Sequence, residues 1–167
     1  MGNIIGVYRL KKINSALVPK RTFEGHRTFA KVYDIYDGDT ITIICRLDRH
    51  EKYRLYKLRL AGLDAPEKKP IKTMPNRELH IRAANKVIHL LTQKINGAVI
   101  SIDFQAEEKY GRTMGVIWTI KRNCTGQWIR KENINQWLID NNLVMKYEGD
   151  TKKEFSIEQL EHIIKFN

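Results

Sequence analysis

The chain has few cysteines, no long apolar run and a shortage of acidic residues, and each of these limits what it can be. Its two cysteines, Cys45 and Cys124, form no CxxC or Cys/His metal pattern, so we expect two buried or half-buried thiols rather than a disulfide or a zinc site. No apolar run approaches the roughly 20 residues that cross a membrane. The apolar start, residues 1–6, is too short for the core of a signal peptide. We therefore expect an intracellular protein, cytoplasmic or associated with nucleic acid.

The shortage of acidic residues is the strongest of these signals. Thirty Lys and Arg residues stand against 19 Asp and Glu, which gives the 167-residue chain a net charge of +11. The surplus gathers in residues 1–31, where seven basic residues accompany one acid, and in residues 52–86, where ten accompany three. Solubility does not require charge of one sign to cluster. The composition therefore favours a polyanionic partner, either nucleic acid or an anionic membrane surface.

Length and periodicity predict one domain over residues 26–167, preceded by a basic arm over residues 1–25. Alternating apolar residues predict five strands, over residues 29–36, 40–47, 52–63, 99–105 and 113–120. Helical periods predict three helices, over residues 76–93, around Trp137, and after Ser156.

The order of these elements, five strands with a helix after the third, is that of an OB-fold. We therefore predict a mainly β, α+β fold in which a five-stranded barrel carries three helices. Ser156 and Gln159 form a capping box that starts the last helix, which is expected to cover an open end of the barrel. His80 and His89 fall off the apolar face of the first helix and are expected at the surface.

Three short charged stretches lie beside the predicted strands, namely Asp37-Gly38-Asp39-Thr40, the segment RLAGLDAPE from Arg59 to Glu67, and Lys109-Tyr110-Gly111-Arg112. Acids repel a polyanionic partner unless a cation binds them. Asp39, Asp64 and Glu67 therefore predict a hard divalent cation with oxygen ligands. Such a cation bridges carboxylates to a phosphate, while Arg59 and Arg112 neutralise the phosphate oxygens.

Each stretch also has a simpler interpretation. Asp37 and Asp39 are common turn residues. Asp64 and Glu67 could form surface ion pairs with Arg59, and Arg112 could cap a hairpin. None of these interpretations accounts for all three stretches together.

Taken in order, the three stretches resemble the signature of the staphylococcal nuclease-like (thermonuclease-like) family, which is a DGDT turn, an R-L-x-G-x-D-x-P-E segment and a K-Y-G-R turn. The resemblance covers roughly residues 27–147. It implies an OB-fold barrel and a metal-dependent nuclease that hydrolyses DNA or RNA to leave 3′-phosphate ends.

The resemblance also implies a role for each candidate residue. The metal, Ca²⁺ with Mg²⁺ or Mn²⁺ as alternatives, would be held by Asp39, Asp64, the backbone carbonyl of Ala65 and, through a water, Thr40. Glu67 would orient or deprotonate the attacking water, and Arg59 and Arg112 would hold the scissile phosphate. The nucleotide would be bound by Lys109, Tyr110 and Tyr147.

Two other functions stay open at this point. The same fold often binds nucleic acid without catalysis, although acids that repel phosphate have no use in such a module. The basic arm, with Gly2 behind Met1, could instead hold the protein at a membrane surface. We expect a monomer without an obligate protein partner, and single-stranded nucleic acid as the preferred ligand.

Overall fold

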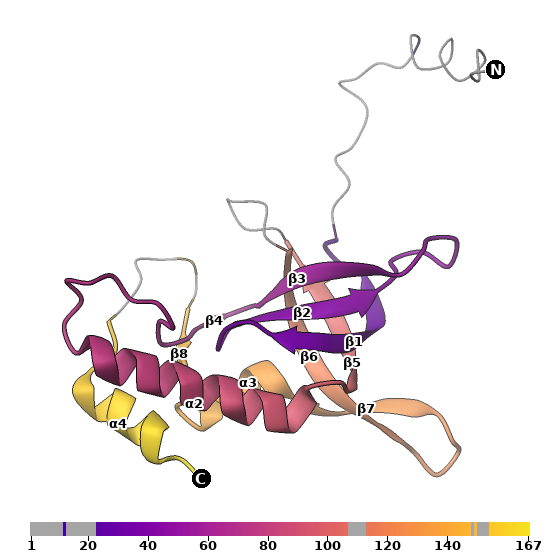
Figure 1. The fold of residues 1–167 in the computed structure, drawn as a ribbon. Helices are drawn as coiled ribbons and strands as arrows, with labels where there is room; N and C mark the ends of the chain where they lie inside the picture. Colours follow the sequence, from indigo (N-terminus) through magenta and orange to yellow (C-terminus); the bar gives the residue numbers. More distant parts are fainter. Residues whose placement is uncertain (1–11, 13–22, 107–112, 148, 150–153) are drawn as a thin grey trace.

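A computed structural model describes residues 12, 23–106, 113–147, 149 and 154–167, which form a closed barrel with helices beside it (Figure 1). The barrel strands follow the order β3-β2-β1-β5-β6, and β6 returns to β3 through a parallel pairing. The remaining barrel pairs are antiparallel. In chain order the elements are β1 (Arg27–Ile35), β2 (Thr40–Cys45), β3 (Arg54–Leu60), β4 (Leu63–Asp64), α2 (Arg77–Ile95), β5 (Val99–Gln105), β6 (Thr113–Arg122), β7 (Trp128–Asn133), α3 (Ile134–Asp140), β8 (Met145–Lys146) and α4 (Ile157–Lys165).

The barrel and the three helices of the described residues confirm the mainly β OB-fold predicted from the sequence. The predicted strand over residues 99–105 is β5, residue for residue. The predicted strand over residues 52–63 is too long, because the chain turns at Gly62, where φ is +77°, before it forms β4. No strand was predicted at β7, which extends the sheet from β6 and has no buried side chain. A strand without a buried face shows no alternation of apolar residues.

The barrel interior is filled by apolar side chains that alternate along the strands. Ile41 and Ile43 of β2 and Leu58 and Leu60 of β3 are completely buried. Burying one side chain of this size contributes about 1.5–3 kcal/mol. The alternation that predicted these strands therefore has a direct physical cause.

Gly115 allows the barrel to close. It lies on β6 between Leu60 of β3 and Phe104 of β5. A Cβ atom at this position would lie 3.1 Å from both the backbone oxygen of Asp103 and Cδ1 of Leu58. A larger residue would therefore push β6 away from one of its two neighbours.

The two cysteines lie in different surroundings. Cys45 is buried on β2, and burial raises the pKa of its thiol to about 11. Cys124 is exposed in the turn between β6 and β7, so the expectation that it is buried or half-buried is wrong. Both thiols are free, as expected.

The helices α2 and α4 pack against each other beside the barrel (Figure 1). The predicted apolar face of α2 is confirmed, since Ala83, Val87 and Leu91 are completely buried. The capping box is also confirmed, because the Ser156 hydroxyl accepts from the Gln159 amide at 3.2 Å and the Ser156 amide donates to Gln159 Oε1 at 2.9 Å. The expectation that α4 covers an open end of the barrel is wrong, because its apolar face lies on α2.

None of the described helices is long and apolar enough to cross a membrane.

His80 corrects a further expectation. Its side chain on α2 is only 6% exposed, and its ring meets the edge of the Phe155 ring at 6.1 Å between centroids. The segment before α4 covers this side of α2, and the helical period of α2 alone could not reveal that cover. His89 is exposed, as predicted.

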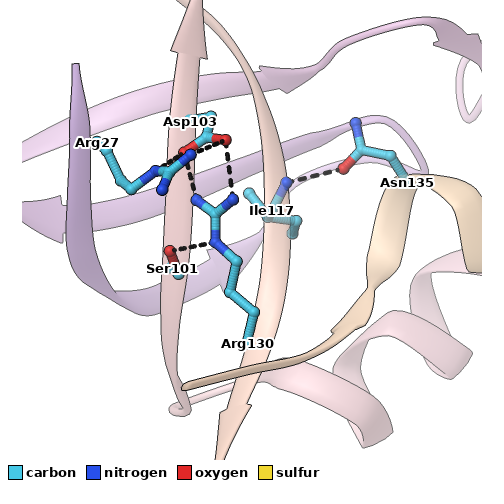
Figure 2. Close-up of polar contacts among 6 residues, drawn as sticks. All are labelled: Arg27, Ser101, Asp103, Ile117, Arg130 and Asn135. Atoms are coloured by element: carbon cyan, nitrogen blue, oxygen red, sulfur yellow. Dashed lines mark hydrogen bonds and ion pairs between the residues drawn. The ribbon is translucent and has the colours of Figure 1, made fainter. Parts of the chain in front are cut away.

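A polar network ties β1, β5, β6 and β7 together on the outside of the barrel (Figure 2). The Asp103 carboxylate accepts from Arg27 Nε at 2.7 Å, from Arg130 Nη1 at 2.9 Å and from Arg130 Nη2. Arg130 Nε donates to the Ser101 hydroxyl at 3.1 Å, and its guanidinium lies 3.7 Å from the ring centroid of Trp118. Asp103 is therefore the acceptor that holds two arginines against the sheet.

The Asp103 network predicts a stability that depends on pH. Hydrogen bonds from Arg130 and Arg27 lower the pKa of Asp103. A carboxyl whose pKa is lower in the folded state stabilises the fold above its unfolded pKa of about 3.9, and this contribution disappears as the pH falls through the folded pKa. We expect Asp103→Asn to lower the free energy of unfolding by about 1–2 kcal/mol at pH 7 and by much less at pH 3, as measured by urea titration. The control is Asp34→Asn, at an exposed position of β1. An equal loss for Asp103→Asn at both pH values would contradict the prediction.

Candidate functional site

A cleft of about 300 Å³ opens where the ends of β1, β2 and β3 meet β4 and the loop after it. It is lined by Tyr36, Asp37, Asp39, Thr40, Arg59, Asp64, Ala65, Pro66, Glu67 and Tyr147. The structure thus brings seven of the predicted site residues together, namely Asp39, Thr40, Arg59, Asp64, Ala65, Glu67 and Tyr147. The other three, Lys109, Tyr110 and Arg112, lie outside the described residues.

The turn between β1 and β2 carries Asp39 into the cleft. The backbone amides of Tyr36 and Asp37 both donate to the Thr40 carbonyl at 3.0 Å, which closes the turn. A Cβ atom at Gly38 would lie 2.7 Å from Cβ of Ala65, so the turn packs directly on the segment that follows Asp64. Sequence reasoning had treated Gly38 as turn chemistry alone. The structure shows that a small residue here lets two distant acidic segments meet.

Arg59 lies between the two aspartates. Its Nη1 pairs with Asp39 Oδ2, and its Nη2 lies 3.3 Å from Asp64 Oδ1 and 3.4 Å from the Leu63 carbonyl oxygen. The three charged side chains are between 6% and 11% exposed. A single guanidinium therefore bridges two largely buried carboxylates.

The segment after Arg59 is held by the last third of the chain. The buried side chain of Asn135 on α3 donates to the Ala61 carbonyl at 2.9 Å, and its oxygen accepts from the Ile117 amide at 3.1 Å (Figure 2 shows the second bond). Asp64, one residue beyond the predicted strand over residues 52–63, lies in β4, which pairs with β8. The Tyr147 amide, just after β8, donates to the Gly62 carbonyl at 3.1 Å.

Asn135 was missed by sequence reasoning. One asparagine in a short amphipathic helix has no local signature, and its three backbone partners lie on other elements. It satisfies buried backbone groups that would otherwise lose their hydrogen bonds. Its contribution to the site is to fix where β3 ends.

Asp37 adds a further carboxylate to the cleft. Burial raises the pKa of Asp37, and the negative charges of Asp39 and Glu67 raise it further. The Gly38 amide, which donates to Asp37 Oδ1 at 2.8 Å, and the Lys68 ammonium act in the opposite direction. The centre of the cleft is therefore acidic, although the protein as a whole is strongly basic.

The oxygen atoms of the cleft fit a hard divalent cation. Asp39 and Asp64 converge, the Thr40 hydroxyl donates to Asp39 Oδ1 at 2.7 Å, and Ala65 borders the same space. Within the described part of the chain, no three His, Cys, Asp or Glu side chains form a cluster that could hold a metal. A cation would therefore take two carboxylates and complete its shell with carbonyl, hydroxyl or water oxygens. This donor set fits Ca²⁺, Mg²⁺ or Mn²⁺ and lacks the nitrogen and sulfur ligands typical of zinc.

The comparison with protein families agrees with this geometry. The model of the family described as "Staphylococcal nuclease homologue" matches residues 57–165, which is more than half of the chain. The match begins in β3 and ends at the last residue of α4, so it includes Arg59, Asp64 and Glu67, while Asp39 lies before it. The search of curated proteins returned no match.

Proposed function

The chain belongs to the staphylococcal nuclease family, and on this premise we propose that it is a Ca²⁺-dependent nuclease that hydrolyses DNA or RNA and leaves 3′-phosphate ends. The observation that carries the proposal is the convergence of Arg59, Asp39, Asp64 and Glu67 on one cleft. A basic protein that only bound a polyanion would gain nothing from acids at the centre of its cleft.

The cation would be held by Asp39, Asp64, the Ala65 carbonyl and, through a water, Thr40. When bound, it would supply positive charge to a phosphate oxygen. It would also replace the charge that Arg59 now provides to both aspartates. The guanidinium would then be able to donate to a substrate phosphate.

Glu67 and Arg59 would act directly on the attacking water and on the phosphate. Glu67 would accept a proton from the water that attacks phosphorus, while the bond from phosphorus to the 5′ oxygen breaks and that oxygen takes a proton from solvent to become a hydroxyl. Arg59 would donate to the phosphate oxygens on which negative charge builds, and Arg guanidinium suits this because it donates in a bidentate fork. The resemblance in sequence gives Arg112 the same task, and it gives Lys109, Tyr110 and Tyr147 contacts with the nucleotide.

The test is a cleavage assay with defined metals. Purified protein is incubated with single-stranded DNA, duplex DNA and RNA, with Ca²⁺, Mg²⁺, Mn²⁺ or a chelator. We expect Ca²⁺-dependent cleavage that stops in chelator, with product 3′ ends that a polymerase extends only after phosphatase treatment. Tight, salt-sensitive binding without cleavage under any of the metals would overturn the proposal and leave a nucleic-acid-binding module.

A further inference from the structure

Tyr36 lines the cleft but takes no part in the mechanism above. It is the last residue before the Asp37 turn, and its side chain is half-exposed, at 49%. Two ammonium groups lie over its ring, Lys57 Nζ at 4.8 Å and Lys68 Nζ at 5.8 Å from the centroid. Lys68 Nζ also donates to the Tyr36 carbonyl at 3.1 Å. An aromatic ring at the border of the cleft thus has two cations beside it.

This border is continuous with the proposed catalytic groups. Lys57 precedes Arg59 by two positions on β3, so both side chains project from the same face of the strand. Lys68 directly follows Glu67 in the loop after β4. A phosphate held by Arg59 would therefore have a basic, aromatic surface beside it.

Aromatic rings beside basic side chains are the combination that binds single-stranded nucleic acid. A base stacks on the ring, and the adjoining phosphate is neutralised by the cations. A base inside a duplex is already stacked and paired, and taking it out costs free energy. A ring at the border of a phosphate-binding cleft therefore selects unpaired nucleotides.

We propose that Tyr36, Lys57 and Lys68 form a nucleotide subsite beside the scissile phosphate. An unpaired base takes the place of the ammonium groups over the Tyr36 ring, and Lys57 and Lys68 turn to bind its phosphate. This inference rests on the proposed nuclease function. With Tyr147 in the same cleft, the substrate places two bases against tyrosine rings. Single-stranded nucleic acid is then the substrate, and duplex is cut only where it opens.

The test uses cleavage to locate the subsite. A series of single-stranded DNA substrates is used. Each carries one abasic residue, at a different distance from the cleaved bond. For the wild-type protein, we expect one distance at which the missing base slows cleavage about tenfold. A second such distance is expected if another base contacts Tyr147. In Tyr36→Leu, the intact substrate is cut about tenfold more slowly in kcat/KM, and the abasic residue at the first distance has no further effect. Tyr36→Phe keeps the wild-type pattern.

The control is Tyr53→Leu. Tyr53 is also exposed, at 65%, and lies under an arginine, with the Arg46 guanidinium 5.2 Å from its centroid, but it is at the opposite end of β3. The Tyr53→Leu protein should cut every substrate at the wild-type rate. If Tyr36→Leu slows all substrates equally, with the full abasic penalty still present, Tyr36 only supports the Lys68 loop and the subsite is refuted.

A binding measurement separates failure of the subsite from failure of the nuclease function. The affinity of wild type and Tyr36→Leu for single-stranded and duplex DNA is measured in chelator. We expect about tenfold weaker binding of single strands by Tyr36→Leu and an unchanged affinity for duplex. If the wild type cuts nothing but this difference in binding is found, the nuclease proposal fails and Tyr36 is a binding site for single strands without cleavage. Equal losses for both forms of DNA would overturn the subsite.

Discussion

Replacing Arg59 with glutamine is expected to lower kcat/KM for single-stranded DNA about a thousandfold and, at the same time, to strengthen Ca²⁺ binding about tenfold. The two effects have opposite signs because Arg59 pairs with Asp39 and Asp64. Its removal takes a donor from the transition state, and it also removes the cation that competes with the metal for both carboxylates. Calorimetric titration with Ca²⁺, in the absence of substrate, measures the second effect independently of activity.

The same substitution should change how stability depends on the metal. Without Arg59, Asp39 and Asp64 stay largely buried but lose the cation that bridges them, which destabilises the fold. Ca²⁺ should restore part of this stability, so the rise in melting temperature on adding Ca²⁺ should be larger for Arg59→Gln than for wild type. Arg54→Gln, at the exposed opposite end of β3, is the matched control and should behave as wild type in all three measurements. If Arg59→Gln binds Ca²⁺ more weakly than wild type, the two aspartates are not the metal ligands.

Glu67→Gln is expected to lower kcat by about 10²–10⁴-fold while leaving KM and the affinity for Ca²⁺ close to their wild-type values. Glutamine keeps the shape of the side chain but cannot accept the proton of the attacking water. Glu67 lines the same cleft as the two aspartates, and the proposed mechanism gives it the chemical step rather than metal binding. Single-turnover cleavage with saturating protein measures this step separately from product release.

The control for Glu67 is Glu161→Gln on α4, which removes an exposed acid that is bonded to Lys165 at 3.0 Å. It changes the net charge by the same amount as Glu67→Gln and should cut DNA at the wild-type rate. A Glu67→Gln protein with undiminished kcat would exclude Glu67 as the general base. A loss that appears only in KM would instead assign Glu67 to substrate binding.

Local patterns were sufficient for most of the fold and for the acidic half of the cleft. The alternation of apolar residues in β5 and the capping box at Ser156 are properties of a few neighbouring residues, and the structure contains both. The cleft residues could be predicted because acidic residues at these positions are hard to explain one at a time in a strongly basic chain. The acids Asp39, Asp64 and Glu67 would repel a polyanionic partner unless they share a cation.

What the sequence could not reveal depends on contacts between distant segments. β4 and β8 are two residues long each and pair across about half of the chain, so neither has a period of its own. The cover over His80 comes from Phe155, far along the sequence. Gly38 packs on Ala65, and two lysine side chains lie over the Tyr36 ring. Both arrangements likewise exist only once the barrel is assembled.

The hydrogen bonds of Asn135 also bear on the order in which the molecule matures. Its side chain reaches back over 74 residues to the Ala61 carbonyl, and contacts so distant in sequence form late because a long loop must close first. A chain that ends before α3 would contain Asp39, Arg59, Asp64 and Glu67 but not the side chain that holds the end of β3 beside them. We therefore expect a growing polypeptide to complete the cleft late, after α3 and β8 have been synthesised and have docked.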